Sequence, residues 1–180
     1  MSRPSHFNLP ARVLHWSMAA AILAMLFVGA AMVVSLRHRE LLLDLHRPLG
    51  LLILVLAVVR LINRWRNPPP PLPADLPRIQ ALAATASHWL LYALMLAMPL
   101  VGWAMLSAGA YPVTVVDGLH LPPILPHDAV LYGVLRPLHR VLAYLLFFTI
   151  MAHLGAALYH LWIRRDGVFE QMAQGGEKGE

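Results

Sequence analysis

The sequence predicts an all-α integral membrane protein, a bundle of four helices that cross the bilayer. The 180 residues are 59% hydrophobic, with a mean hydropathy of +0.62. A soluble domain of this size exposes too much surface to carry so apolar a composition. Four apolar runs are each long enough to cross a bilayer, and lipid admits only helices or closed barrels because backbone polar groups must be paired. We expect one domain over residues 1–180.

The expected spans are residues 13–36, 45–65, 82–106 and 138–163. The first is longer than the apolar core of a signal peptide, so we expect it to be retained as a helix. Residues 67–73 read Asn-Pro-Pro-Pro-Pro-Leu-Pro, a stiff extended connector that cannot continue either neighbouring helix. Residues 107–137 lack a spanning pattern and are expected to form a cap over one mouth of the bundle.

The charged residues and the lack of cysteine exclude several functions. The net charge is +5, but the arginines flank the apolar runs, as expected at lipid headgroups and not in a nucleic-acid binder. The chain has no cysteine, which excludes covalently attached c-type haem, thiolate-bound iron–sulfur clusters, thiol catalysis and disulfides. Any metal must be held by His, Met, a carboxylate or a cofactor.

The distribution of Arg and Lys predicts the orientation. One side of the expected bundle has nine such residues and the other has five; they are Arg3, Arg12, Arg60, Arg64, Arg66, Arg78, Arg164, Arg165 and Lys178 against Arg37, Arg39, Arg47, Arg136 and Arg140. The positive-inside rule then places both termini in the cytoplasm.

Histidines within the apolar runs fall at two depths. His139 and His153 are 14 residues apart, which on a helix means about 21 Å along the axis and about 40° short of full register, so both face the bundle interior. His46 matches His139 in depth at the outer level. His15 matches His153 at the inner level, and depth alone does not exclude His88 as the inner partner.

An idle imidazole in hydrocarbon is costly, so these histidines indicate a function. Zinc prefers about four ligands, whereas each level offers two imidazoles, which is what one bis-histidine haem iron needs. We therefore predict two haems in the bundle core. Gly50, Ala143 and Gly155 would let a flat macrocycle approach the backbone, although small residues equally serve helix contacts. Arg60 could neutralise haem propionates or extend to the headgroups, and the sequence favours neither.

Several pieces of sequence occur in an order typical of one family. They are Arg12-Val-Leu-His-Trp16, His46-Arg-Pro-Leu-Gly50, Ser87-His-Trp-Leu-Leu-Tyr92 with Pro99-Leu-Val-Gly-Trp103, and the stretch from His139 through His153 to His160. Over nearly its whole length the chain resembles the prokaryotic cytochrome b561 family of di-haem, quinone-linked bacterial membrane cytochromes, which includes superoxide oxidase. More distantly, it resembles the cytochrome b subunits of hydrogenases and formate dehydrogenases.

This resemblance implies roles for six histidines. It implies that His15 with His153 ligate a haem b on the cytoplasmic side, and that His46 with His139 ligate a haem b on the periplasmic side. It further implies that His88 is not an iron ligand and that His88 and His160 belong to a quinone site, where an imidazole could hydrogen-bond or protonate a quinone carbonyl. The expected location is the bacterial inner membrane, and pairing of protomers in the lipid is left open.

The function expected from the resemblance is electron transfer from a periplasmic one-electron donor, with superoxide as the expected donor, through both haems to ubiquinone. Arginines around the outer mouth could steer an anionic donor, or they could pair with propionates and with Glu40 and Asp44. One alternative is a membrane-anchor and electron-transfer subunit of a dehydrogenase or hydrogenase, although a length near the minimum for four spans favours a stand-alone enzyme. A haemless transporter or scaffold is a third.

Overall fold

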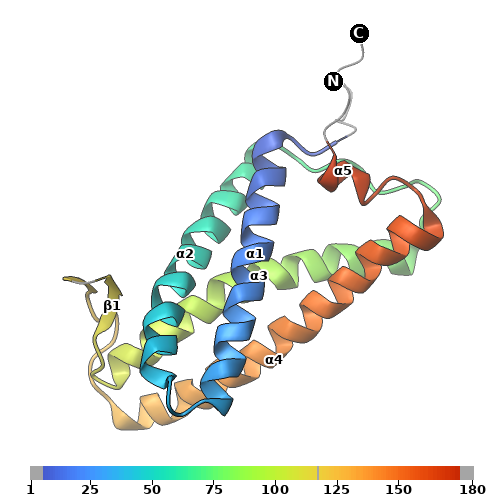
Figure 1. The fold of residues 1–180 in the computed structure, drawn as a ribbon. Helices are drawn as coiled ribbons and strands as arrows, with labels where there is room; N and C mark the ends of the chain where they lie inside the picture. Colours follow the sequence, from blue (N-terminus) through green and yellow to red (C-terminus); the bar gives the residue numbers. More distant parts are fainter. Residues whose placement is uncertain (1–5, 117, 175–180) are drawn as a thin grey trace.

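The structure is a computed structural model, and it describes residues 6–116 and 118–174 (Figure 1). Four long helices dominate it: α1 (Leu9–Val34), α2 (Arg39–Arg66), α3 (Arg78–Ala108) and α4 (Ala129–Tyr159). The smaller elements are strands β1 (Val113–Val116) and β2 (Leu119–Leu121), a π-helical turn η1 (His160–Arg164) and a short helix α5 (Glu170–Ala173). Arg3 and Lys178, which entered the charge count, lie outside the described residues.

All four long helices are long and apolar enough to cross a membrane. Only 6–22% of the residues in their most apolar windows are buried within the protein, and large hydrophobic side chains such as Phe27, Val33 and Phe148 are exposed. Such a surface is stable against lipid and not against water. The prediction of an all-α membrane bundle is therefore confirmed.

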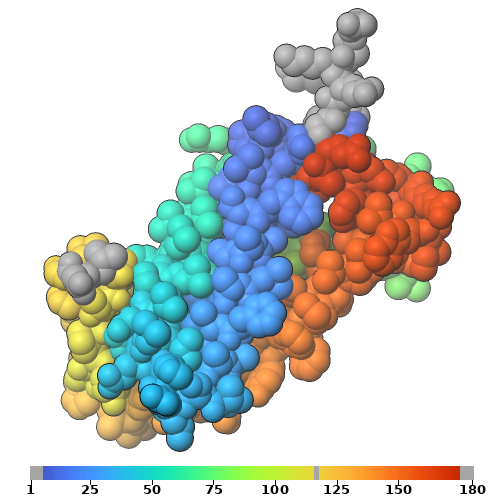
Figure 2. All heavy atoms as spheres, in the orientation of Figure 1, coloured from blue at the N-terminus to red at the C-terminus, as the bar shows by residue number. Residues whose placement is uncertain are grey.

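The helices alternate in direction (Figure 1). Close backbone approaches join α1 to α2, α2 to α3 and α3 to α4, whereas α1 and α4 approach one another at few positions. The start of α1, the proline connector and α5 lie at one end, here called the connector end, and the β1–β2 hairpin lies at the other, the hairpin end. Figure 2 shows a hollow between α1 and the C-terminal half of α4. The bundle is thus open along one of its four sides.

The buried core is small and lies at mid-depth. It consists of Met18, Ile22, Ile53, Ala57, Tyr92 and Met95, from α1, α2 and α3. Met18 follows His15 by one turn, and Tyr92 follows His88 by one turn, so this cluster separates the inner histidines from the outer pair. Side chains packed this closely hold the three helices at a defined depth relative to one another.

Loop segments are tied to the bundle at both ends. At the hairpin end, the Trp103 indole donates to the carbonyl of Pro122 at 2.9 Å, and the amide of Ile124 donates to the Ser107 hydroxyl at 3.1 Å. At the connector end, the Trp16 indole donates to the carbonyl of Met172 at 3.3 Å, and Arg12 donates to that of Ala173 at 3.2 Å. These bonds hold the C-terminal segment over the start of α1.

The helices are longer than the sequence patterns suggested. α1 begins at Leu9 because the Asn8 side chain accepts the amide of Ala11 at 2.9 Å. The largest difference is at α4, which was expected to begin at residue 138 and begins at Ala129, so residues 129–137 of the expected cap segment are helical. The Asp128 side chain accepts two amides of the first turn, and such caps set a helix start that an apolar pattern alone does not reveal.

We expect Asp128→Ala to destabilise the protein by about 1 kcal/mol, because the first turn of α4 loses the acceptor for two backbone amides. Thermal unfolding in detergent would measure the change. Asp128→Asn is the matched control, because an asparagine at this position caps about as well as an aspartate. Equal unfolding temperatures for the two variants would contradict the capping role.

Candidate functional site

At the hairpin end, the structure brings His46 of α2 and His139 of α4 together. Their ring centroids are 6.2 Å apart and the ring planes are 66° apart. The Nδ1 atoms of both rings are buried, and neither has a hydrogen-bond partner among the described residues. Gly102 of α3 lies against this pair, since a Cβ there would be 3.3 Å from Cε1 of His139. The expected outer pair therefore meets across the bundle interior.

At the connector end, three histidines from three helices meet. The ring centroids of His15 and His153 are 6.3 Å apart with an interplanar angle of 68°, and those of His88 and His153 are 5.4 Å apart. The structure thus places His153 between His15 and His88. His139 and His153 are both on α4, and their separation in sequence places the two histidine levels about 21 Å apart along the helix axis.

The spacing within the two predicted pairs is that of two imidazoles bound to one metal ion. An imidazole nitrogen binds a first-row metal at about 2.0 Å, so two rings on opposite sides of one ion have centroids about 6 Å apart. The 6.2 Å and 6.3 Å separations meet this condition. The ring centroids of His88 and His153 are 5.4 Å apart, which is closer than those of two imidazoles on opposite sides of one metal ion. Two donors in each predicted pair also suit a ligand that supplies the other donors itself, as a tetrapyrrole does.

The glycines near the histidines differ in what surrounds them. A Cβ added at Gly155, two residues from His153, would meet nothing within 4 Å, whereas one added at Gly50 would meet the Met25 side chain at 3.6 Å. Gly155 is exposed and lies about 200° around α4 from His153. The space beside it therefore faces away from the inner pair, and Gly50 lies in an ordinary helix contact. The hollow between α1 and α4 in Figure 2 separates the helices that carry His15 and His153.

Arg60 turns into the bundle and does not extend to the headgroups. Its Nε donates to the Tyr92 hydroxyl at 3.1 Å, and one terminal nitrogen lies 2.9 Å from Nδ1 of His15. A His15 ring that accepts this bond carries its hydrogen on Nε2, whereas a ring that binds metal through Nε2 carries it on Nδ1. Arg60 and a metal ion therefore require different tautomers of His15. The sequence alone did not indicate a role for Tyr92, which ends the stretch Ser87-His-Trp-Leu-Leu-Tyr92.

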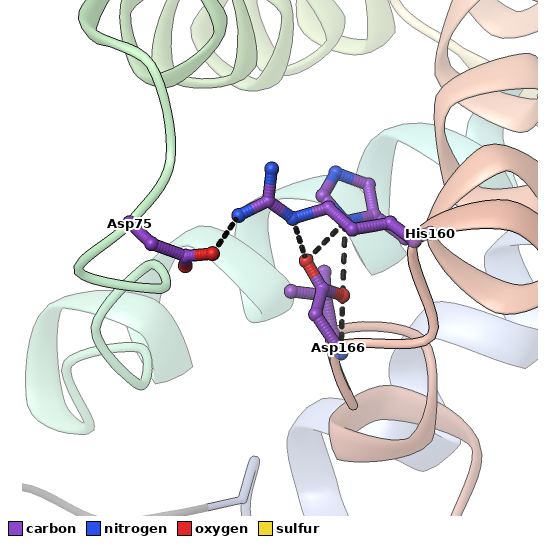
Figure 3. Close-up of polar contacts among 5 residues, drawn as sticks. Asp75, His160 and Asp166 are labelled. Carbon is purple, nitrogen blue, oxygen red and sulfur yellow. Dashed lines mark hydrogen bonds and ion pairs between the residues drawn. The ribbon is translucent and has the colours of Figure 1, made fainter.

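His160 occupies a separate polar cluster beyond the inner level (Figure 3). Its Nδ1 lies 2.8 Å from one carboxylate oxygen of Asp166 and 3.0 Å from the other. Arg164 joins the cluster, with its Nε 2.6 Å from Asp166 and a terminal nitrogen 2.7 Å from Asp75 in the connector. Among the described residues His160 makes no ring contact with His88, which instead lies against His153.

The surroundings of Asp166 favour its ionised form. Burial raises the pKa of Asp166, but hydrogen bonds from His160, the Val168 amide and Arg164 outweigh that effect, so the pKa lies below its usual value. Asp166 is thus a carboxylate that accepts from every polar neighbour. The sequence did not indicate this contact, because on a continuous α-helix a residue six positions after His160 lies on a different face.

At the outer mouth, most of the arginines have no acidic partner. Arg47 lies 3.6 Å from Asp44. Within residues 6–116 and 118–174 no ion pair involves the other four, Arg37, Arg39, Arg136 and Arg140. Pairing with Glu40 or Asp44 is therefore found, among the described residues, only for Arg47, and the alternative of pairing with propionates stays a prediction. The hairpin end presents positive charge.

Comparisons with known proteins agree with this geometry. The family described as prokaryotic cytochrome b561 matches residues 6–175. The chain is 28% identical to cytochrome b561 homolog 2 of Escherichia coli (strain K12) over 94% of this chain and 92% of the relative. It is 30% identical to cytochrome b561 homolog 1 of the same organism over 72% and 73% of the two chains. It is 33% identical to the probable superoxide oxidase CybB of Yersinia pestis, over 71% and 72%.

The family match covers nearly the whole chain, and it includes all four long helices and both histidine levels. A family of b-type cytochromes implies haem b, and the paired imidazoles provide donors of the required kind. The chain therefore belongs to the prokaryotic cytochrome b561 family of membrane electron-transfer proteins.

Proposed function

We propose that the protein transfers electrons across the bacterial inner membrane, from superoxide on the periplasmic side through two haems b to ubiquinone. The observation that carries this proposal is the pair of imidazole couples, with ring centroids 6.2 Å and 6.3 Å apart at two levels of the bundle. The name of the Yersinia pestis relative supports superoxide as the donor. Both termini then lie in the cytoplasm, as the Arg and Lys distribution favours.

His46 with His139 would hold the periplasmic-side haem, and His15 with His153 the cytoplasmic-side haem. Bound in this way, haem supplies a reversible one-electron couple at the iron. Two histidine ligands leave no open position for a substrate, so the chain must bring the donor to the edge of the group. The half-buried rings come from α1, α2 and α4. The core cluster joins α1 and α2 to α3, and Ile150 of α4 packs against it.

Arg60 would act as a counter-charge at the inner haem. When His15 binds metal through Nε2, its Nδ1 carries hydrogen and no longer accepts from Arg60. The guanidinium, still held by Tyr92 at 3.1 Å, is then available to pair with an anionic group such as a haem propionate. We therefore propose Arg60 as a cofactor-binding residue.

The hairpin end would attract the donor by its charge. Superoxide is a small anion, and the four arginines without acidic partners there would raise its rate of encounter. At the connector end, His88 and His160 would bind the quinone. The ring centroid of His88 lies 5.4 Å from that of His153, and His160 lies at the start of η1, beyond the inner level. Ubiquinone reaches this end from the lipid, which surrounds the exposed Trp162 and Ile163.

The haem assignment predicts the pigment content of two variants. His46→Ala and His153→Ala should each lower the haem per chain by about half, because each removes one ligand of a different bis-histidine site. Haem and protein would be quantified in the purified proteins. His120→Ala is the control, since His120 lies exposed on the hairpin and contacts Thr114. Full haem content in both ligand variants, or fewer than two haems per wild-type chain, would refute the assignment.

Gly102 gives a more selective test of the outer site. In Gly102→Val the new side chain begins 3.3 Å from Cε1 of His139, so it should displace that ring and change only the outer haem. Redox titration of the visible spectrum should show one shifted or missing component. Gly29→Val is the matched control, because nothing lies within 4 Å of a Cβ at Gly29. Two unaltered components in Gly102→Val would contradict the proposed position.

Electrostatic steering predicts that haem reduction by superoxide slows as salt is added. Raising the ionic strength from about 0.01 M to 0.15 M shortens the Debye length from about 30 Å to about 8 Å. The double variant Arg136→Gln/Arg140→Gln should be slower at low salt and less sensitive to salt, whereas Arg78→Gln, at the connector end, should behave as wild type. The rate would be followed by the haem absorbance. A rate independent of salt would exclude steering, and no reduction by superoxide would exclude superoxide as donor.

A further inference from the structure

At the end of α4 the backbone turns back, so that the residues after the helix lie beside His160. The helix widens there into the π-helical turn η1, closed by the amide of Arg165 donating to the carbonyl of His160 at 2.7 Å. Arg165 then adopts the left-handed conformation, with φ of 53°. A π-turn and a left-handed residue are common at helix C-termini, where they end the helix and turn the chain back. Here they place Asp166 beside the His160 ring.

Asp166 is surrounded by donors. Its carboxylate accepts from Nδ1 of His160 at 2.8 Å, from Nε of Arg164 at 2.6 Å and from the Val168 amide at 3.3 Å. The side chains of His160 and Asp166 are only 16% and 13% exposed. A carboxylate held by three donors has little freedom to rotate, so it fixes the orientation of the ring that it contacts.

The contact also determines which nitrogen of His160 can act on a ligand. An ionised carboxylate only accepts hydrogen bonds, so Nδ1 of His160 carries a hydrogen directed at Asp166, and Nε2 is left to face another group. A proton bound at Nε2 could then be donated to the group that this nitrogen faces. Other charged or titratable groups around the ring are Arg164, which is bound to Asp166, Asp75, which is bound to Arg164, and Tyr159 at 5.8 Å.

We propose that Asp166 is a positioning residue for quinone reduction, which holds Nε2 of His160 toward the quinone. This inference rests on the proposed function. Reduction of one quinone to the quinol takes two electrons, delivered one at a time from the haems, and two protons. One proton passes from Nε2 of His160 to a carbonyl oxygen as the N–H bond breaks and the O–H bond forms, and the imidazole regains a proton from water. The other oxygen takes its proton from water.

Arg164 and Asp75 have a supporting place in this arrangement. Arg164 keeps its proton at all accessible pH, so it cannot relay one. Its two contacts, 2.6 Å to Asp166 and 2.7 Å to Asp75, instead attach the end of α4 to the connector (Figure 3). The Asp75 side chain is 80% exposed, and an ion pair to so exposed a group contributes little. The local contact between His160 and Asp166 is therefore the one on which the chemistry depends.

The test separates the two half-reactions of the haem-loaded protein. Haems reduced beforehand would be mixed with short-chain ubiquinone, and their reoxidation would be followed by stopped-flow absorbance at several quinone concentrations. Asp166→Asn should lower the limiting rate by about 10-fold or more, the range expected when a general acid is mispositioned. The half-saturating quinone concentration, the haem content and the rate of haem reduction by superoxide should stay unchanged. Asp166→Glu, which restores the carboxylate, should recover most of the limiting rate.

Asp75→Asn is the matched control, because it breaks the ion pair with Arg164 and leaves the contact of His160 with Asp166; it should reoxidise at the wild-type rate. If Asp75→Asn slows reoxidation as much as Asp166→Asn does, the cluster is only structural. An unchanged limiting rate in Asp166→Asn, or a change confined to the half-saturating concentration, also overturns the positioning role. A wild-type protein whose reduced haems are not oxidised by ubiquinone would instead refute the proposed function.

Discussion

The high cost of an unpaired imidazole in an apolar bundle is the constraint on which this structure depends. A buried imidazole nitrogen without a partner is costly, and among the described residues the Nδ1 atoms of His46 and His139 have none. His46 meets His139 at 6.2 Å and His15 meets His153 at 6.3 Å. The first contact joins α2 to α4 and the second joins α1 to α4, so each links helices that are distant in sequence. The same pairs are the imidazoles that we propose as haem ligands.

The architecture around these pairs is open. Three of the four sides of the bundle are closed by adjacent helices, while α1 and α4 approach each other at few positions. The small core of α1, α2 and α3 side chains maintains the depth of the two levels. A protein that binds large planar groups need not pack every helix against its neighbours, because the bound groups themselves supply apolar contact surface. Haem b, which the family implies, would supply that surface between α1 and α4.

The two ends of the bundle differ in chemistry in a way that suits electron transfer across it. The hairpin end presents arginines, and most of them have no acidic partner within the described parts of the chain. The connector end places His160 in a cluster with Asp166 and Arg164. Positive charge attracts anions over several ångströms, whereas a carboxylate in contact with an imidazole acts locally to orient the ring. One end is thus suited to capture an anionic donor and the other to move a proton.

Four spans, their approximate positions and the matched depths of the histidines could be predicted from the sequence, because hydropathy and the rise of a helix depend on the order of residues alone. The start of α4 could not, since the cap at Asp128 outweighs the apolar pattern there. The inward turn of Arg60 toward Tyr92 and His15 arises between helices. Asp166 reaches His160 only through the π-helical turn and the left-handed Arg165. Residue order by itself determined how deep each histidine lies, and the tertiary structure decided which polar group each one contacts, because contacts depend on how helices cross and where the backbone reverses.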